Sequence, residues 1–325
     1  MKIINIPDSK LIEINGNIVF IANYSLIEPS ETIGVIVHYD ILYNKNNLYK
    51  LKIENNYCFG AGISSAKGAI YQIINTLKNS KICNNKKLKI IFTKDETTGS
   101  KEGTKYLVDN YEKIIDADYY WIPDCTDKFI SIGCYNILVH HILIFGDGGH
   151  PIYSKIKNNT NIETAKKILL LNEKIKKLNR NYSEENVLIN FISTEVKNKN
   201  NIVPSTGEIT IEYRINPKIK FIQLKKKINS IYNNLKIKKN SKLIFNGYLS
   251  RTQKSNNLIK IIKRQCPKVK KEIEKGNHDG AYIGFKLKKE VIGFLPGGKN
   301  LHMPTECVNM ETLSRVGKIF QELIK

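Results

Sequence analysis

The pattern of apolar and polar residues in the first part of the chain switches between two periods. Six short segments have the apolar content and the length of β-strands: residues 2–6, 11–14, 18–22, 33–37, 88–92 and 119–122. Between them, Ile70, Ile73, Ile74 and Leu77 recur at the spacing of one helical face, and residues 102–110 form a second amphipathic stretch. Strands that alternate with helices predict a mixed, mostly parallel sheet flanked by helices.

The pattern changes at about residue 136. The next segments have the character of a strand, a helix, two strands and a helix, at residues 137–145, 163–178, 187–193, 208–215 and 222–235. This order is typical of a small α+β module of the ferredoxin-like type. We therefore expect residues 136–237 to form a domain that is inserted into a catalytic domain, whose two parts are residues 1–135 and 238–325.

The last part of the chain is expected to complete the catalytic domain. Residues 243–249 are predicted to return to its sheet, followed by a helix at 258–265, a strand at 291–295 and a closing amphipathic helix at 310–324. The predicted fold class is therefore α/β, with an inserted α+β domain.

The composition is that of a globular protein with a sizeable core. The chain has 325 residues, of which 41% are hydrophobic and 25% are charged, and this length favours two domains. No apolar run is long enough to cross a membrane, and residues 1–8 lack the pattern of a signal peptide. The 6 cysteines are dispersed, which excludes a zinc ribbon and predicts reduced thiols in a cytoplasmic protein with no membrane partner.

The chain is strongly basic, with a formal net charge of +22 at pH 7. Its lysines are spread through segments that are equally rich in Ile, Asn and Tyr, all of which have AT-rich codons, so base composition explains the charge as solvated lysines. A functional basic surface for an acidic partner is the alternative. No nucleic-acid-binding motif accompanies the charge, and no specific nucleic-acid partner is predicted.

The first candidate for chemistry is the pair His38 and Asp40, at the end of a predicted strand. Side chains two residues apart in a strand leave the same face, so an imidazole can bind a metal while the carboxylate orients it. Alone, such a pair is more typical of a satisfied contact at a strand terminus.

Further motifs follow in an order that gives this pair its meaning. They are the glycine-rich run at 58–68, Asp95-Glu96-Thr97 after a strand, Asp124 after the next strand, Gly148-Gly149-His150, Asn201 to Pro204, the turn at 276–280, and the run 297–306 with His302. From about residue 33 onward the series resembles the dinuclear-zinc amidohydrolase and exopeptidase family of succinyl-diaminopimelate desuccinylase, acetylornithine deacetylase, aminoacylase and glutamate carboxypeptidase.

The resemblance implies a set of metal ligands and a general base. His38, Asp124 and His302 fall on ligand positions, Asp40 on the supporting carboxylate, and Glu96 on the general base. Neutral residues occupy two further positions, Ser65 where the family has the carboxylate that bridges two metals and Thr97 where it has a carboxylate ligand. Hydroxyl groups are poor substitutes for these ligands, so one zinc, cobalt or manganese ion is expected rather than two. Cys125 and His278 lie nearby, but both are more typical of structural residues.

The resemblance also implies substrate-binding residues. His150 corresponds to a residue that reaches the active site of a partner subunit and stabilises the oxyanion, and Arg214 is placed to hold a substrate carboxylate. Asn201, Gly276, Asn277 and Asp279 are expected to line the same pocket. The inserted domain is then a lid and dimerisation domain of a homodimer.

Two functions follow from these residues. The first is a metal-dependent hydrolase of the amide bond of a small N-acyl amino acid or peptide, in amino-acid biosynthesis. The alternative is a non-catalytic homologue that has lost its metal site and binds a ligand or a partner protein through the old cleft. The family usually begins with a helix packed on the catalytic sheet, whereas this chain begins with predicted strands, so another helix is expected to cover that surface.

Overall fold

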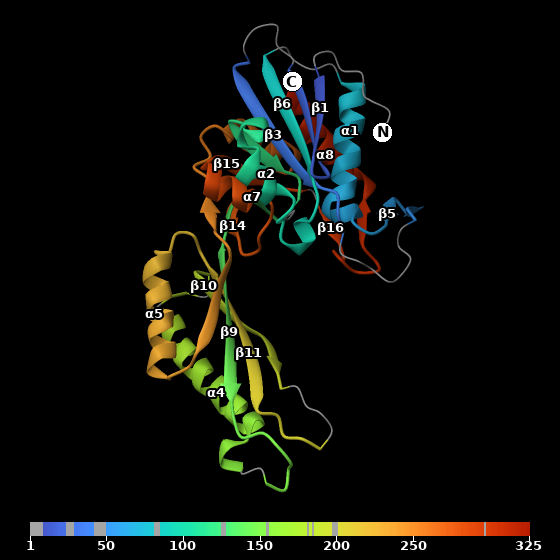
Figure 1. The fold of residues 1–325 in the computed structure, drawn as a ribbon. Coiled ribbons are helices and arrows are strands. Elements are labelled where there is room, and N and C mark those ends of the chain that lie inside the picture. Colours follow the sequence, from blue (N-terminus) through green and yellow to red (C-terminus); the bar gives the residue numbers. More distant parts are fainter. Residues whose placement is uncertain are drawn as a thin grey trace. The chain divides into compact units, whose positions relative to one another are not determined.

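The computed structural model describes residues 9–23, 29–41, 50–80, 85–124, 128–153, 156–180, 182–183, 185–196, 201–295 and 297–325. The chain divides into two compact units (Figure 1). The first unit comprises Met1–Cys134 and Tyr248–Lys325, and the second comprises Tyr135–Gly247. The strand predicted at residues 2–6 and the neighbour of Asp124, Cys125, lie outside the described residues.

The first unit is built on a nine-stranded mixed sheet. Its strands lie in the order β1 (Ser9–Ile14), β2 (Asn17–Asn23), β6 (Lys86–Thr93), β3 (Glu31–His38), β7 (Tyr119–Ile122), β15 (Glu290–Gly293), β8 (Phe129–Cys134) and β13 (Tyr248–Leu249), with β14 (Lys270–Glu274) also paired to β8. The central strands β6, β3, β7 and β15 are parallel, whereas β1, β2 and β13 are antiparallel to their neighbours. The predicted mixed sheet with a mostly parallel centre is confirmed.

Helices cover both faces of this sheet because successive residues of its buried strands point to opposite sides. On β3, Val35 packs in the core with α1 (Gly68–Asn79), α6 (Asn256–Gln265) and α8 (Met310–Ile324). Its neighbour Ile36 packs in a second core with α2 (Thr104–Asn110), α3 (Glu112–Ile115) and α7 (Gly280–Tyr282). The continuous apolar run that predicted this strand is therefore buried on both sides.

The first described strands form a hairpin at one edge of the sheet. Asn15 and Gly16 join β1 to β2 with φ values of 49° and 77°, the left-handed pair that a two-residue type I′ turn requires. Strand β2 then pairs with β6, so this hairpin extends the sheet where the family resemblance implies a helix.

The second unit is a four-stranded antiparallel sheet with two helices. Its elements are β9 (Asn136–Phe145), α4 (Thr160–Asn179), β10 (Val187–Glu195), β11 (Thr206–Ile215), α5 (Phe221–Asn234) and β12 (Lys239–Phe245). The strand order is β10-β11-β9-β12, and both helices pack on one face of this sheet (Figure 1). The unit therefore contains the predicted strand, helix, two strands and helix, followed by a fourth strand, β12.

The boundary of the second unit differs from the predicted one. The segment that the sequence returns to the first domain at residue 238 begins with β12, which pairs with β9 and closes the second sheet as far as Gly247. An apolar strand does not specify in its own sequence which of two sheets it joins. The pairing of β12 with β9 shows that it belongs to the second sheet, so the inserted unit ends at residue 247 and not at the predicted residue 237.

A small third sheet joins two loops of the first unit. Its strands lie in the order β16 (Gly298–Lys299), β17 (Cys307–Asn309), β5 (Tyr57–Phe59) and β4 (Lys52–Glu54). The pairing of β17 with β5 brings the run 297–306 beside the glycine-rich run that begins at residue 58.

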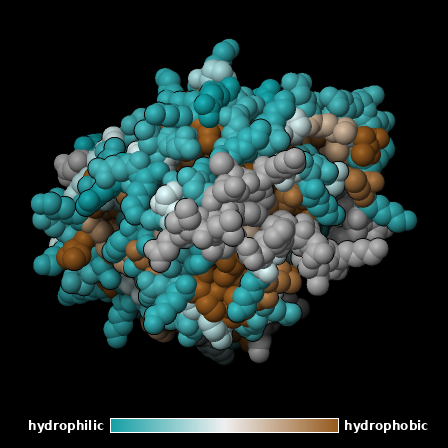
Figure 2. Space-filling model, turned by 90° about the horizontal axis from the view of Figure 1, so that it is seen from above, coloured by the Kyte–Doolittle hydropathy of each residue, from teal (hydrophilic) through white to brown (hydrophobic). Residues whose placement is uncertain are grey.

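Hydrophilic side chains cover most of the face shown in Figure 2. Within the described residues, no helix is both long and apolar enough to span a membrane.

Candidate active site

Three ionisable side chains meet at one edge of the main sheet. His38 is the last residue of β3, Glu96 lies in the turn that follows β6, and Asp124 follows β7. Because β6, β3 and β7 are parallel neighbours, their carboxyl ends lie at the same edge, which is where open α/β sheets bind ligands. The order of the strands thus assembles residues that are far apart in the sequence.

The three side chains form a compact cluster. His38 Nε2 lies 3.6 Å from Asp124 Oδ2 and 4.0 Å from Glu96 Oε2. One ligand atom from each residue lies within 4.8 Å of the others, and the three side chains are only 3%, 15% and 18% exposed. An imidazole nitrogen and two carboxylate oxygens thus converge in a sheltered position.

Asp40 holds the His38 ring from its other side. His38 Nδ1 lies 3.1 Å from the main-chain oxygen of Asp40 and 3.4 Å from its Oδ1. A ring N–H donated in this direction leaves the Nε2 lone pair facing Glu96 and Asp124. Burial lowers the pKa of His38, but the hydrogen bond to Asp40 and the charges of Asp124, Glu96 and Asp279 outweigh this effect and raise the pKa to about 10.

The carboxylate of Asp40 also fixes the turn that carries Glu96. Asp40 Oδ1 accepts a hydrogen bond from Glu96 N at 3.1 Å, and Oδ2 accepts from Thr97 N at 3.0 Å and from Thr97 Oγ1 at 2.6 Å. The turn begins at Asp95 with a left-handed φ of 65°. Although burial alone raises the pKa of Asp40, the hydrogen bonds from His38 and Thr97 hold it well below its usual range.

Glu96 lies in a strongly acidic environment. Burial raises the pKa of Glu96 to about 8, with further contributions from the charges of Asp124 and Asp279. Asp279 is 2% exposed and accepts hydrogen bonds from Thr93 Oγ1 at 2.8 Å and from the Ser100 hydroxyl. This carboxylate therefore lies inside the protein, where it joins the end of β6 to the segment that follows Glu96.

The sequence comparison identifies the family to which this site belongs. The profile of Peptidase family M20/M25/M40 matches residues 34–325. The chain belongs to this family. Membership confirms the resemblance inferred from the motifs and makes the protein a metallohydrolase of a class that acts on amide or peptide bonds.

Similar proteins come from several organisms. A succinyl-diaminopimelate desuccinylase of Pelagibacter ubique is 24% identical over 294 residues, which cover 84% of this chain and 75% of that protein. An uncharacterized metallohydrolase of Methanocaldococcus jannaschii is 26% identical over 365 residues, which cover 100% of this chain and 87% of that protein.

Solved structures show the same fold. A tripeptidase of Staphylococcus aureus aligns with a TM-score of 0.75 at 16% identity, covering 98% of this chain and 88% of that one. An M20 family metallo-carboxypeptidase of Sulfolobus solfataricus aligns with a TM-score of 0.73 at 15% identity, covering 97% of this chain and 89% of that one.

The cluster fits a divalent metal ion of the kind that M20 enzymes use. The charges of Asp124 and Asp279 help to raise the pKa of Glu96, and a divalent cation held beside His38 would relieve this repulsion between carboxylates. Nitrogen and carboxylate ligands suit zinc, manganese and cobalt.

Neutral or exposed side chains occupy the other family ligand positions. Ser65 is 4% exposed in the turn before α1, with its Oγ 3.5 Å from the Gly62 oxygen, and the Thr97 hydroxyl is engaged by Asp40. His302 is exposed in a turn with a left-handed φ of 62°. Among the described residues, the only group of three or more acidic, histidine or cysteine ligands is the His38 cluster.

Sequence reasoning missed Glu306, which joins the two loops near this position. Its carboxylate is 2% exposed and accepts hydrogen bonds from Gly62 N at 2.9 Å, from Ser64 N at 2.9 Å and from Ser64 Oγ at 2.8 Å. It thereby ties the loop of His302 to the turn of Ser65. Nothing in the sequence distinguishes this acid from a surface glutamate, because its partners are more than 240 residues away in the chain.

The turn at 276–280 is tightly bonded within itself. Asn277 Oδ1 accepts a hydrogen bond from His278 N at 2.7 Å, and Gly276 and Asn277 are partly exposed. His278 is 4% exposed, with its Nε2 3.3 Å from the Tyr248 hydroxyl. His278 is therefore a buried residue that packs under the turn.

In the second unit, the structure brings His150 and Asn201 together. Asn201 Nδ2 lies 3.2 Å from His150 Nε2. Main-chain hydrogen bonds between Gly149 and Val203, at 2.9 and 2.8 Å, hold the two loops side by side. Both predicted residues thus belong to one exposed group.

Arg214 lies at the opposite end of the second sheet. It is paired in register with Ile137, near the beginning of β9, whereas the loop of His150 follows the end of that strand. Its Nε donates a hydrogen bond to Glu212 Oε1 at 2.6 Å, and its side chain is 31% exposed. Arg214 is therefore separated from His150 by almost the length of the strand.

Proposed function

We propose that the protein is a single-metal hydrolase that cleaves the amide bond of a small N-acyl amino acid or a short peptide. The convergence of His38, Glu96 and Asp124 at the carboxyl edge of the sheet carries this proposal. The names of the relatives, a desuccinylase and a tripeptidase, support the substrate class. The desuccinylase also supports a place in amino-acid biosynthesis.

His38 and Asp124 are proposed to hold the ion, with zinc as the first choice and cobalt or manganese as alternatives. When bound, a divalent ion supplies Lewis acidity, which makes a water molecule acidic enough to be a nucleophile near neutral pH. Asp40 keeps the Nε2 lone pair of His38 directed into the site.

Glu96 is proposed to carry the proton. It accepts a proton from the attacking water and passes it to the departing amine, and a pKa near neutrality serves both transfers. The hydrogen bond from its main-chain N–H to Asp40 fixes the turn, so the carboxylate stays directed at the cluster.

The second unit is proposed to contribute the substrate-binding groups. Arg214 would pair with the substrate carboxylate, and His150 with Asn201 would stabilise the oxyanion in the site of a second copy, which makes the protein a homodimer. Gly276 and Asn277 would line the pocket of the first unit. The four cysteines within the described residues are free thiols, which supports a reducing, cytoplasmic compartment.

Metal content and turnover of the Glu96→Gln variant test this proposal together. We expect protein purified without chelator to hold one zinc, cobalt or manganese ion per chain and to hydrolyse a member of a panel of N-acyl amino acids and dipeptides. Glu96→Gln should retain the ion while its turnover falls by roughly 100-fold or more, and His38→Ala should lose the ion.

Two results would contradict the proposal in different ways. Loss of the ion in Glu96→Gln would make Glu96 a metal ligand and not the proton carrier. Absence of metal after incubation with excess zinc, together with no turnover of the whole panel, would favour the non-catalytic homologue.

A further inference from the structure

A cavity lies in the first unit, between the end of α6 and the first turns of α8. Its volume is about 420 Å³, which is within the range of small-molecule sites. None of the residues of the His38 cluster lines it. It is therefore separate from the candidate active site.

The lining of this cavity combines a basic rim with an apolar wall. Lys268 and Arg315 contribute two positive charges, and none of the described residues that line the cavity is acidic. Pro267, which is exposed, and Val269, which is half-buried, supply apolar surface, and the fully buried Phe294 also borders the cavity. A ligand that satisfies both parts carries a negative charge on a hydrocarbon body.

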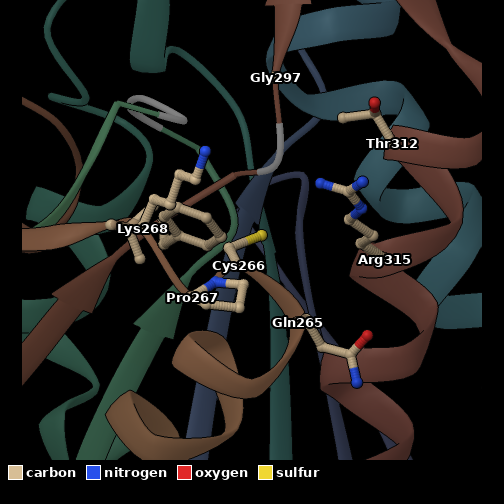
Figure 3. Close-up of a pocket in the computed structure, with 9 residues that line it drawn as sticks. Gln265, Cys266, Pro267, Lys268, Gly297, Thr312 and Arg315 are labelled. Atoms are coloured by element: carbon tan, nitrogen blue, oxygen red, sulfur yellow. The ribbon is translucent and has the colours of Figure 1, made fainter.

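Arg315 retains most of its capacity to bind an anion. Its ion-pair partner is Glu311, at 3.8 Å, and the side chain of Glu311 is 74% exposed. An exposed pair at this distance contributes little, so the guanidinium remains available to a better acceptor. Figure 3 shows this group directed from α8 toward Cys266, with Lys268 on the other side of the cavity. The two cations therefore border the same cavity.

We propose that this cavity binds a small organic carboxylate, with its charged group between Lys268 and Arg315 and its apolar part against Pro267 and Val269. Inorganic phosphate would satisfy the two cations but leave the apolar wall uncovered, and a neutral hydrocarbon would leave the cations unpaired. The proposal is independent of the hydrolytic function.

The chain contains its own reporter for this cavity. Trp121 is the single tryptophan, its Nε1 donates a hydrogen bond to the Phe294 oxygen at 3.1 Å, and its ring stacks on Phe320 of α8 with the centroids 6.4 Å apart. A ligand that fills the cavity bordered by Phe294 and the first turns of α8 changes the surroundings of this indole. The fluorescence of Trp121 should therefore respond to occupancy.

The experiment titrates the full chain with hexanoate and follows Trp121 fluorescence, with calorimetry in parallel. Hexanol has a similar apolar body without the charge, acetate has the charge without the body, and inorganic phosphate tests the cations alone. We expect saturable binding of hexanoate that is at least about tenfold tighter than binding of the other three, because hexanol lacks the charge-assisted hydrogen bonds, whereas acetate and phosphate lack the hydrocarbon that covers the apolar wall.

Two variants place the binding in this cavity. Arg315→Gln and Lys268→Gln should each weaken hexanoate binding by roughly tenfold, whereas Lys318→Gln, an exposed lysine of the same helix, should leave it unchanged. Hexanoate should also slow the alkylation of Cys266, measured by peptide mass spectrometry. Circular dichroism verifies that each variant is folded.

Four results would overturn the proposal. They are the absence of a saturable signal with hexanoate, equal affinity for hexanol, unchanged binding in both cavity variants, and an unchanged alkylation rate of Cys266.

Discussion

At the scale of single residues, Asp40 determines the geometry of the candidate site. Its carboxylate binds the turn of Glu96 and Thr97 through three hydrogen bonds and contacts the ring of His38. One side chain thereby positions both the imidazole and the proposed proton carrier. The same bonds give the Thr97 hydroxyl a structural role at a position where the family resemblance implies a metal ligand.

We expect Asp40→Asn to weaken metal binding by roughly 10- to 100-fold, because an amide can accept on one side only and the ring and the turn lose their common support. Zinc titration by calorimetry measures this change. Glu13→Gln, which alters an exposed acid of the same unit, is the matched control and should bind zinc like the parent protein. Equal zinc affinity in Asp40→Asn would show that the ring is positioned by other contacts.

The contribution of Glu290 to the stability of the fold is expected to depend on pH. Its carboxylate accepts hydrogen bonds from Gln253 N at 2.8 Å, from Ser255 N at 2.9 Å and from Ser255 Oγ at 2.8 Å, just before α6. Burial alone raises the pKa of Glu290, but these hydrogen bonds outweigh it and lower the pKa below its ordinary value. The stability that Glu290 contributes is therefore present above the pKa of the unfolded chain and is lost as the pH falls through the lower pKa of the folded state.

Chemical denaturation at pH 7 and at about pH 3 measures this contribution. We expect Glu290→Gln to be less stable than the parent at pH 7 by about 1 kcal/mol, as for the loss of a helix cap, and the difference to shrink at the lower pH. A difference that stays constant between the two pH values would exclude the carboxylate as its source.

At the scale of elements, contacts between loops hold together segments of the first unit that are distant in the sequence. The run 297–306 and the turn before α1 lie more than 200 residues apart in the sequence. The pairing of β17 with β5 and the buried carboxylate of Glu306 hold them together. The left-handed φ of 79° at Gly62 directs the N–H groups of this turn toward that carboxylate, which is a common arrangement for binding an anion.

Glu306→Gln is expected to lower the free energy of unfolding by about 1–3 kcal/mol, because an amide leaves at least one buried N–H group without its acceptor. Hydrogen exchange should accelerate in residues 298–306 and around Gly62, as measured by mass spectrometry. Glu311→Gln, in the first turn of α8, alters a 74% exposed side chain, and the stability of this variant should change by less than about 0.5 kcal/mol. Equal effects of the two substitutions would show that the carboxylate of Glu306 does not hold the two loops together.

At the scale of the whole molecule, the second unit is a separate compact unit within the chain. It has its own core, formed by α4, α5 and its sheet, and both of its ends lie beside the same pair of strands of the first unit, since Cys134 pairs with Tyr248. A domain with adjacent ends can be inserted into a loop without disturbing its host.

The isolated segment Tyr135–Gly247 should therefore fold alone and unfold in one cooperative transition on heating. Circular dichroism measures this transition. A shorter segment that ends at residue 237 lacks β12, which leaves the edge of β9 unpaired and removes Leu243 from the core. We expect the shorter segment to be unfolded or to melt at a clearly lower temperature. Equal melting temperatures would show that β12 is dispensable to this unit.

Two strands show how much of the fold the sequence predicts. The strand at 119–122 is predicted to the residue because all four of its side chains are apolar and buried. In contrast, β14 consists of Lys270, Lys271, Glu272, Ile273 and Glu274, and its charged pattern gave no strand signal because it is largely exposed and pairs only with β8. The order of motifs identified His38, Glu96 and Asp124 as candidates, but not the distances between them.

The sequence by itself determined the alternation of strands and helices, the inserted α+β module and the order of the motifs, because periodicity and strand-end residues are local properties. The tertiary structure decided which side chains meet. It placed the carboxylate of Glu96 beside His38 and Asp124, directed the Thr97 hydroxyl to Asp40, and buried Glu306 against Gly62. These outcomes depend on strand order and on contacts between segments distant in the chain, and no local pattern encodes them.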